Sequence, residues 1–409
     1  MNTNVADAEQ TEENAPSSLL IALVIVVIFL HVLLFAYKNL LDPPFESESL
    51  SLLLLLLLLS FADNLISKRS DLSISVTTKR PASQVRTSSK EGGRENQEAR
   101  KDSTSTLRSP SSSVHPNEIE HFSKLSSEWW DEHGEFGLLH SMNKVRIQFI
   151  REKLEEVKGY ESAFREVHGR SLDPHLNGGE KEGQEEKKTR FLEGLKVLDV
   201  GCGGGLLSES LTRLGAKTTG LDASPSNIKI ASIHSSKDPE LAGGLEYIHS
   251  TAEELVRLSD SKGSYDLVLA MEVIEHVKGP GEFLTTLDSL LKPGGHLFLS
   301  TISRTNLSWF LTILMAERLL RFVTPGTHTH EQYINPEELV EFVNVQLGWK
   351  AGWSTFESRE AISLPERIKI ETRGTAYLPW KSSWELLGKD SFYPDTKACN
   401  YFFWARKPF

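Results

Sequence analysis

The feature that most constrains the fold is a short apolar run that breaks into glycines. Residues 196–205 read KVLDVGCGGG, and a helical pattern begins directly afterwards. Glycine adopts positive φ and lets the backbone approach a ligand closely, while a helix that starts there offers unpaired N–H groups. Asp222 follows Gly201 by 21 residues and ends the next apolar run. An acid at that place accepts the hydroxyls of a ribose, so the pattern predicts a site for a ribose-bearing cofactor.

Apolar runs and helical patterns alternate after this turn. The sequence predicts strands at 196–200, 218–221, 245–249, 265–270 and 296–301, and helices at 206–214, 226–235, 252–258 and 280–291, with a turn at 292–295. A further strand is expected at 401–406. Such alternation is typical of an α/β fold with a doubly wound parallel sheet, which binds ligands at the carboxyl ends of its strands.

Composition excludes several classes of protein. The net charge of −11 over 409 residues argues against general nucleic-acid binding. Cys202 and Cys399 are the only cysteines, so neither a disulfide framework nor a cysteine metal cluster is expected. Cys202 lies inside the glycine turn, where a small side chain fits, and we interpret it as a packing choice.

The first 115 residues form two segments of unlike character. Residues 19–37 are almost wholly apolar and have the length of a membrane-spanning helix. These residues form either such a helix or part of a signal-like segment or of a misassigned upstream exon. The acidic residues before them are unlike a mitochondrial presequence, which is rich in Arg and Ser and poor in acids. With the leucine-rich block at 50–61, residues 19–37 complete a hydrophobic extension, residues 1–66. Residues 67–115 are rich in Ser, Arg and Lys, which predicts a disordered linker or a displaced transit peptide.

Globular character begins near residue 116. Apolar residues at helical spacing predict helices within 117–130 and 143–157, and the charged segment 169–190 is expected to be a surface loop. After the fifth strand, residues 307–323 (LSWFLTILMAERLLRFV) form either a buried lid helix or a helix lying on a membrane surface. Asn335 before a proline predicts the N-cap of a helix at 336–345.

Three residues that follow the fourth strand carry the strongest chemical signal. Glu272, Glu275 and His276 share one arc of a helical turn at 100° per residue. Two carboxylates and an imidazole at this edge suit Mg²⁺ or Mn²⁺, His276 alone suits a general base, and an ordinary acidic helix start explains the pattern equally. Arg146, on the helix before the core sheet, is a candidate for a cofactor carboxylate.

Arg304, His328 and His330 are weaker candidates for substrate contact, because they lie near the proposed lid rather than at a strand end.

These motifs together resemble a known family. The core motifs are typical of class I S-adenosylmethionine-dependent methyltransferases: VLDVGCGGG, GLDAS, YDLVLAMEVIEHV and LKPGGHLFLSTISR. Three further segments, at 128–146, 305–328 and 330–339, make the chain similar to the ubiquinone-biosynthesis O-methyltransferases, which methylate polyprenylated catechols. The resemblance covers residues 117–409.

The resemblance implies a Rossmann-like sheet of seven strands whose last strand is antiparallel, in a methyltransferase domain at 116–409 with N-terminal helices. It places cofactor contacts on Arg146, Gly201, Gly203, Asp222 and Met271. It implies Mg²⁺ ligands at Glu272, Glu275 and His276, the residues expected to be catalytic.

The resemblance also implies that the insertion at 305–330 contacts lipid. It therefore favours the membrane-surface interpretation of residues 307–323 over the lid helix. The expected setting is the matrix side of the mitochondrial inner membrane, within a multi-subunit ubiquinone-biosynthesis complex. Two alternatives remain: a methyltransferase for another hydrophobic small molecule, and a non-catalytic assembly subunit with a vestigial cofactor pocket.

Overall fold

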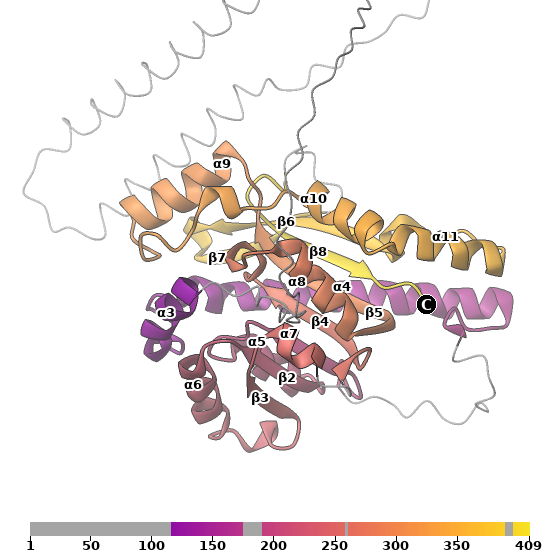
Figure 1. Cartoon of the computed structure of the whole chain (residues 1–409), viewed down its shortest axis with the longest axis horizontal. Helices are drawn as coiled ribbons and strands as arrows, with labels where there is room; N and C mark the ends of the chain where they lie inside the picture. Colours follow the sequence, from indigo (N-terminus) through magenta and orange to yellow (C-terminus); the bar gives the residue numbers. More distant parts are fainter. Residues whose placement is uncertain (1–115, 175–189, 258–260, 389–395) are drawn as a thin grey trace, which may run out of the picture. The chain divides into compact units, whose positions relative to one another are not determined.

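The structure is a computed structural model that describes residues 116–174, 190–257, 261–388 and 396–409. Figure 1 shows the helices arranged around one twisted sheet. The predicted hydrophobic extension, the Ser/Arg/Lys-rich segment and most of the charged loop at 169–190 lie outside the described residues. Among the helices that the structure describes, none combines the length and the apolar character that crossing a bilayer requires.

The sheet has eight strands in the order β3-β2-β1-β4-β5-β8-β6-β7. The first five are parallel: β1 (Lys196–Val200), β2 (Lys217–Asp222), β3 (Leu245–His249), β4 (Tyr265–Met271) and β5 (Leu291–Ile302). The last three pair antiparallel: β6 (Ile370–Leu378), β7 (Ser383–Leu386) and β8 (Asn400–Arg406). The α/β class and the methyltransferase topology are therefore confirmed.

Two details of the sheet correct the sequence prediction. The expected number of seven strands is wrong, because the short edge strand β7 adds an eighth. The expected turn at 292–295 is instead the beginning of β5, where the register against β4 shifts between Tyr265 and Leu267. Gly294 has φ 74° there, so the glycine pair makes a bulge inside the strand rather than a turn before it.

The central strands bury both of their faces. Along β4, Leu267 and Leu269 point to one hydrophobic cluster, while Val268 and Ala270 point to the other. The first cluster is covered by α4 (Gly137–His168) and α5 (Leu206–Arg213), and the second by α7 (Ala252–Arg257), α8 (Pro280–Leu290), α10 (Pro336–Glu341) and α11 (Trp349–Glu360). A parallel sheet covered on both sides explains why its strands read as continuous apolar runs.

Additional short elements lie at the ends of these layers. The chain enters through α3 (Pro116–Lys124) and the 3₁₀ turn η1 (Ser126–Glu128), and α6 (Pro225–Ser235) follows β2. The predicted helix at 307–323 is one turn of α9 (Asn306–Ser308) continued by a π-helix, η6 (Trp309–Leu319). Asn335 caps α10 in a capping box, as expected, and a second π-helical segment, η8 (Phe342–Gln346), continues α10.

Candidate active site

The glycine turn after β1 is held by backbone hydrogen bonds to the neighbouring strand. The N–H groups of Gly201 and Cys202 both donate to the carbonyl of Leu221, at 2.7 and 3.0 Å. Gly201 has φ 70°, and a Cβ there would lie 2.5 Å from Cγ2 of Val273. Only glycine satisfies both the positive φ and this close approach. The turn therefore brings bare backbone to the carboxyl edge of the sheet.

Asp222 ties the end of β2 to this turn. Its Oδ2 accepts from the N–H of Gly203 at 2.9 Å, and its Oδ1 accepts from the N–H of Ser224 and from Nδ2 of Asn227. Burial raises the pKa of Asp222, and these three hydrogen bonds oppose that rise. A carboxylate beside a glycine turn is the arrangement that accepts ribose hydroxyls.

An aromatic pair from the N-terminal segment covers the turn. The ring of Trp129 faces Gly203 and Gly204 so closely that a Cβ on Gly203 would lie 2.2 Å from its Cζ2 atom. Trp129 stacks on Phe136 and donates from Nε1 to Oδ1 of Asn227 at 3.1 Å. Trp130 donates to the carbonyl of Gly204. The N-terminal segment is thus part of the site.

Arg146 reaches the site from α4 and is only 5% exposed. Its Nε and Nη2 atoms are buried and have no hydrogen-bond partner. Burial lowers the pKa of this guanidinium, and the carboxylates of Glu272, Asp199 and Glu275 oppose the shift. Unpaired buried donors are costly, and two N–H groups on one guanidinium match the fork that binds a ligand carboxylate.

The three residues after β4 lie at the same edge but not on one helical turn. Glu272 has φ 58° and donates from its N–H to the carbonyl and hydroxyl oxygens of Ser300. Glu275 and His276 follow in a 3₁₀ turn, η5 (Ile274–His276). The predicted shared helical arc is therefore wrong for Glu272. A glutamate in the left-handed region stores backbone strain, which is common at functional sites.

Glu275 is the most buried of the three. It accepts from the hydroxyl of Thr301 at 2.9 Å through Oε2, and burial together with the charge of Glu272 raises its pKa. Its Oε1 and the Oε1 of Glu272 are buried without a hydrogen-bond partner.

The donor chemistry of these carboxylates suits a hard cation. The side chains as placed form no cluster of three or more metal-ligating groups, nor does any other set among the described residues. The Mg²⁺ assignment therefore remains a prediction.

Two further rings meet His276. Phe122 of α3 packs edge-on against it at 5.3 Å between ring centroids, and His328 lies 6.1 Å away. His328 donates from Nδ1 to Oε1 of Glu317 at 2.7 Å, and Glu317 also accepts from the backbone N–H groups of Gly326 and His328. Glu317, a buried residue of the π-helix η6, thus holds residues 326–328 beside His276.

The structure brings most of the predicted residues together. Gly201, Gly203 and Asp222 form one cluster, Arg146 interacts electrostatically with Glu272 and Glu275, and Met271 ends β4 in the core. Two weaker candidates lie elsewhere. His330 bonds to the carbonyl of Thr305, and Arg304 pairs with Glu338.

Four site residues were not predicted: Phe122, Trp129, Asp199 and Asn227. Asp199 alone leaves a signal in the sequence, as a charge inside an apolar strand. It is buried, accepts from Ser208 at 2.6 Å, and burial raises its pKa to about 6.

The chain is similar to proteins of one known family. A family model described as a methyltransferase domain matches residues 170–348. The ubiquinone biosynthesis O-methyltransferase, mitochondrial, of Schizosaccharomyces pombe is 40% identical over 296 residues, covering 72% of this chain and 88% of that protein. The chain belongs to the ubiquinone-biosynthesis O-methyltransferase family.

Other members of the family match over similar spans. The Caulobacter vibrioides protein is 42% identical, covering 57% of this chain and 81% of its own length. The mitochondrial protein of Rattus norvegicus is 36% identical, covering 68% of this chain and 67% of its own. The expectation of an S-adenosylmethionine-dependent O-methyltransferase is confirmed at the level of the family.

Proposed function

We propose that this chain transfers the methyl group of S-adenosylmethionine to a phenolic oxygen of a polyprenylated catechol in ubiquinone biosynthesis. The observation that carries the proposal is that the site contains both buried N–H groups of Arg146 without a partner and the carboxylate of Asp222 at the glycine turn. S-adenosylmethionine offers a carboxylate to the first and a ribose to the second. The named activity of the relatives supports O-methylation.

Transfer requires little covalent work from the protein. The sulfonium carbon is already activated, so the site has to align it with the acceptor oxygen and remove a proton. The S–C bond breaks as the O–C bond forms, and S-adenosylhomocysteine leaves. Arg146, Asp222 and the glycine turn fix the donor. The acceptor ring then lies against Glu272, Glu275 and His276.

We propose His276 as the group that accepts the phenolic proton. A neutral imidazole is suited to proton transfer near pH 7, and the neighbouring Glu275 favours the imidazolium that forms. Mg²⁺ is the second candidate for activating the phenol, since an ion bound to Glu272, Glu275 and His276 would supply the charge that favours the phenolate. The buried, unpartnered oxygens of the two glutamates support such a site.

Variants of the residues next to the acceptor ring test the roles proposed for His276 and Glu275. His276→Ala and Glu275→Gln should lose turnover while their affinity for S-adenosylmethionine, measured by calorimetry, stays that of the parent. Thr285→Ser, an exposed change on α8, is the matched control. Full activity in both site variants would remove them from the mechanism. Calorimetric titration with Mg²⁺ separates the two roles, because only the metal assignment predicts binding that Glu275→Gln abolishes.

We further propose that residues 116–409 form the catalytic domain and that residues 307–323 touch a membrane surface. The exposed apolar side chains of this segment support the contact: Trp309, Leu319 and Phe322. Replacing these three with serine should release the protein from anionic vesicles in a flotation assay. Unchanged flotation would refute the contact.

The mitochondrial names of two relatives support a mitochondrial setting, for which we propose the matrix side of the inner membrane within a multi-subunit biosynthetic complex.

A further inference from the structure

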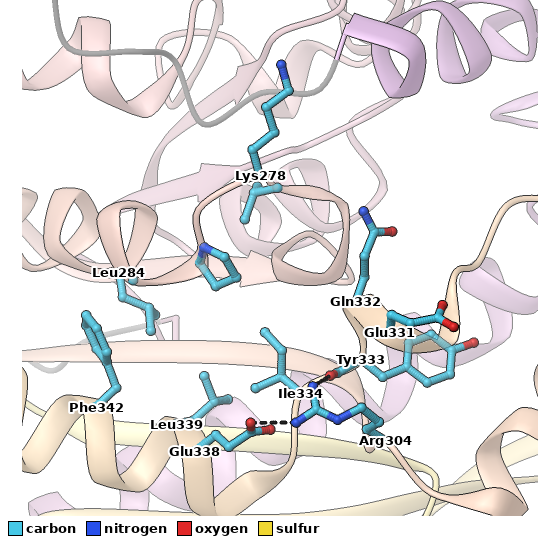
Figure 2. A pocket seen from close by; sticks show the side chains of 13 residues that line it. Lys278, Leu284, Arg304, Glu331, Gln332, Tyr333, Ile334, Glu338, Leu339 and Phe342 are labelled. Atoms are coloured by element: carbon cyan, nitrogen blue, oxygen red, sulfur yellow. Dashed lines mark hydrogen bonds and ion pairs between the residues drawn. The ribbon is translucent and has the colours of Figure 1, made fainter.

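A cavity lies beside the candidate active site. It has a volume of about 490 Å³ and opens between the start of α8 and the segment that runs from η7 (His330–Gln332) into α10 and η8. In Figure 2, Leu284 on the first side faces Leu339 and Phe342 on the second, while Lys278 points away from them. None of the residues given a catalytic or cofactor role lines it, so it is distinct from the site described above.

The cavity is apolar inside and charged only at its rim. Six apolar side chains line it: Val277, Pro280, Leu284, Ile334, Leu339 and Phe342. The four charged residues of its lining are all exposed, namely Lys278, Arg304, Glu331 and Glu338. Two cations and two anions balance, and Nη2 of Arg304 pairs with Glu338 at 2.6 Å. An uncharged apolar occupant therefore suits the cavity better than an anion.

The cavity adjoins the wall of the active site at two residues, Val277 and Tyr333. Val277 follows His276 directly in the chain. Tyr333 lines the cavity, and its ring centroid lies 6.1 Å from the ring centroid of His328. The ring centroid of His328 in turn lies 6.1 Å from the ring centroid of His276. One tyrosine thus separates the cavity from the rings around the proposed acceptor position.

We propose that this cavity binds the first isoprenoid units of the substrate tail, next to the catechol ring. The inference rests on the proposed function, because it assumes an acceptor ring at His276. A chain attached to that ring has to leave the site, and the apolar cavity lies next to His276 along the chain through Val277 and next to His328 through the ring of Tyr333. Burying each methylene of the tail there would favour binding by about fourfold, which selects prenylated over unprenylated catechols.

Gly281 allows the cavity to be filled without touching the catalytic residues. It is the second residue of α8, and a Cβ there would lie 2.8 Å from Cε2 of Phe342. Gly281→Leu should occupy the tail site, and leucine favours a helix more than glycine does. Thr285→Leu adds the same side chain one turn along the helix at an exposed position outside the cavity, and serves as the control.

The test compares two catechols, one without a tail and one with several isoprenoid units in detergent micelles. Gly281→Leu should lower kcat/KM for the tailed catechol about 15-fold, the loss expected for roughly two buried methylenes, and leave the tailless compound unaffected. Thr285→Leu should leave both unchanged. An unchanged ratio of the two substrates in Gly281→Leu would overturn the proposal.

A photoreactive isoprenoid alcohol gives a readout that does not depend on methyl transfer. It should label peptides within 277–284 or 334–342 in the parent protein, with labelling lost in Gly281→Leu and retained in Thr285→Leu. Labelling confined to other peptides would place the tail elsewhere. If the parent methylated neither catechol, the proposed function would fail, whereas the labelling would still decide the tail site.

Discussion

Replacing Asp222 with asparagine should weaken cofactor binding sharply while the protein still folds. The carboxylate at the end of β2 accepts from Gly203, Ser224 and Asn227. Asparagine keeps the shape of the side chain but has a single acceptor oxygen, so its amide group must face one of these donors. The substitution therefore tests both the role of the charge in binding and its part in holding the glycine turn.

The expected magnitude follows from these contacts. A hydrogen bond to a charged group contributes about 1.5–3 kcal/mol, and a neutral one about half of that. With two ribose hydroxyls on the carboxylate, we expect binding of S-adenosylmethionine to weaken by about 2–3 kcal/mol, or roughly 30- to 150-fold in Kd. The unsatisfied donor should lower the free energy of unfolding by about 1–3 kcal/mol.

Isothermal titration calorimetry measures the first effect and urea denaturation the second. Asp266→Asn is the matched control, since this carboxylate lies at the start of β4, where it pairs with Lys292 and accepts from the N–H of Lys196. It should leave the cofactor Kd unchanged. A folded Asp222→Asn protein with the parent's Kd would refute the ribose role.

Three further substitutions test the rest of the cofactor side. Arg146→Lys keeps the charge but not the fork, so the cofactor Kd should rise about tenfold; equal calorimetric affinity would contradict the carboxylate contact. Burial raises the pKa of Asp199 to about 6, so the folded protein binds the proton of this carboxyl more tightly than the unfolded chain does. The stabilisation of the fold by this proton is present below about pH 4 and is lost as pH rises through 6, about 3 kcal/mol in all. Asp199→Asn should therefore flatten the fall in unfolding free energy between pH 4 and 7, and parallel curves would count against the shift. Trp129→Phe leaves Oδ1 of Asn227 without its indole donor and should cost about 1–3 kcal/mol in urea denaturation, whereas an unchanged midpoint would show that this bond is not stabilising.

The parallel half of the sheet was predictable because its signal is local. β1 and β3 have the predicted bounds, β2 extends one residue beyond its predicted bounds at each end, and β4 extends one residue at its C-terminal end. Both faces of β1 and β4 are buried, so these two strands read as apolar runs between turn residues. The glycine turn and Asp222 were predictable for a related reason, since the backbone geometry there restricts the residue types.

The antiparallel edge was not predictable in the same way. β6 contains Glu371 and Arg373, which break an apolar pattern. In the fold, Glu371 accepts from the buried Lys153 of α4 at 2.7 Å, and Arg373 pairs with Glu152 of the same helix. These partners lie more than 200 residues away along the chain. Tertiary contacts therefore override the local preference, and the sequence alone does not reveal them.

The aromatic residues that cover the site were not predictable for another reason. Trp129 and Phe122 lie on a segment whose helical spacing indicates only an apolar face. Their positions over Gly203 and His276 depend on how that face docks. Helical periodicity identifies which residues are buried, but not which partner buries them.

Methyl transfer itself is the most direct test of the proposed function. Purified protein is incubated with S-adenosylmethionine carrying a trideuterated methyl group and a prenylated catechol, and the products are analysed by mass spectrometry. We expect one trideuteromethyl group on a phenolic oxygen of the catechol, with an equal amount of S-adenosylhomocysteine, and no transfer by His276→Ala. Cofactor binding without any labelled catechol, with Mg²⁺ present as well as absent, would contradict the proposed function.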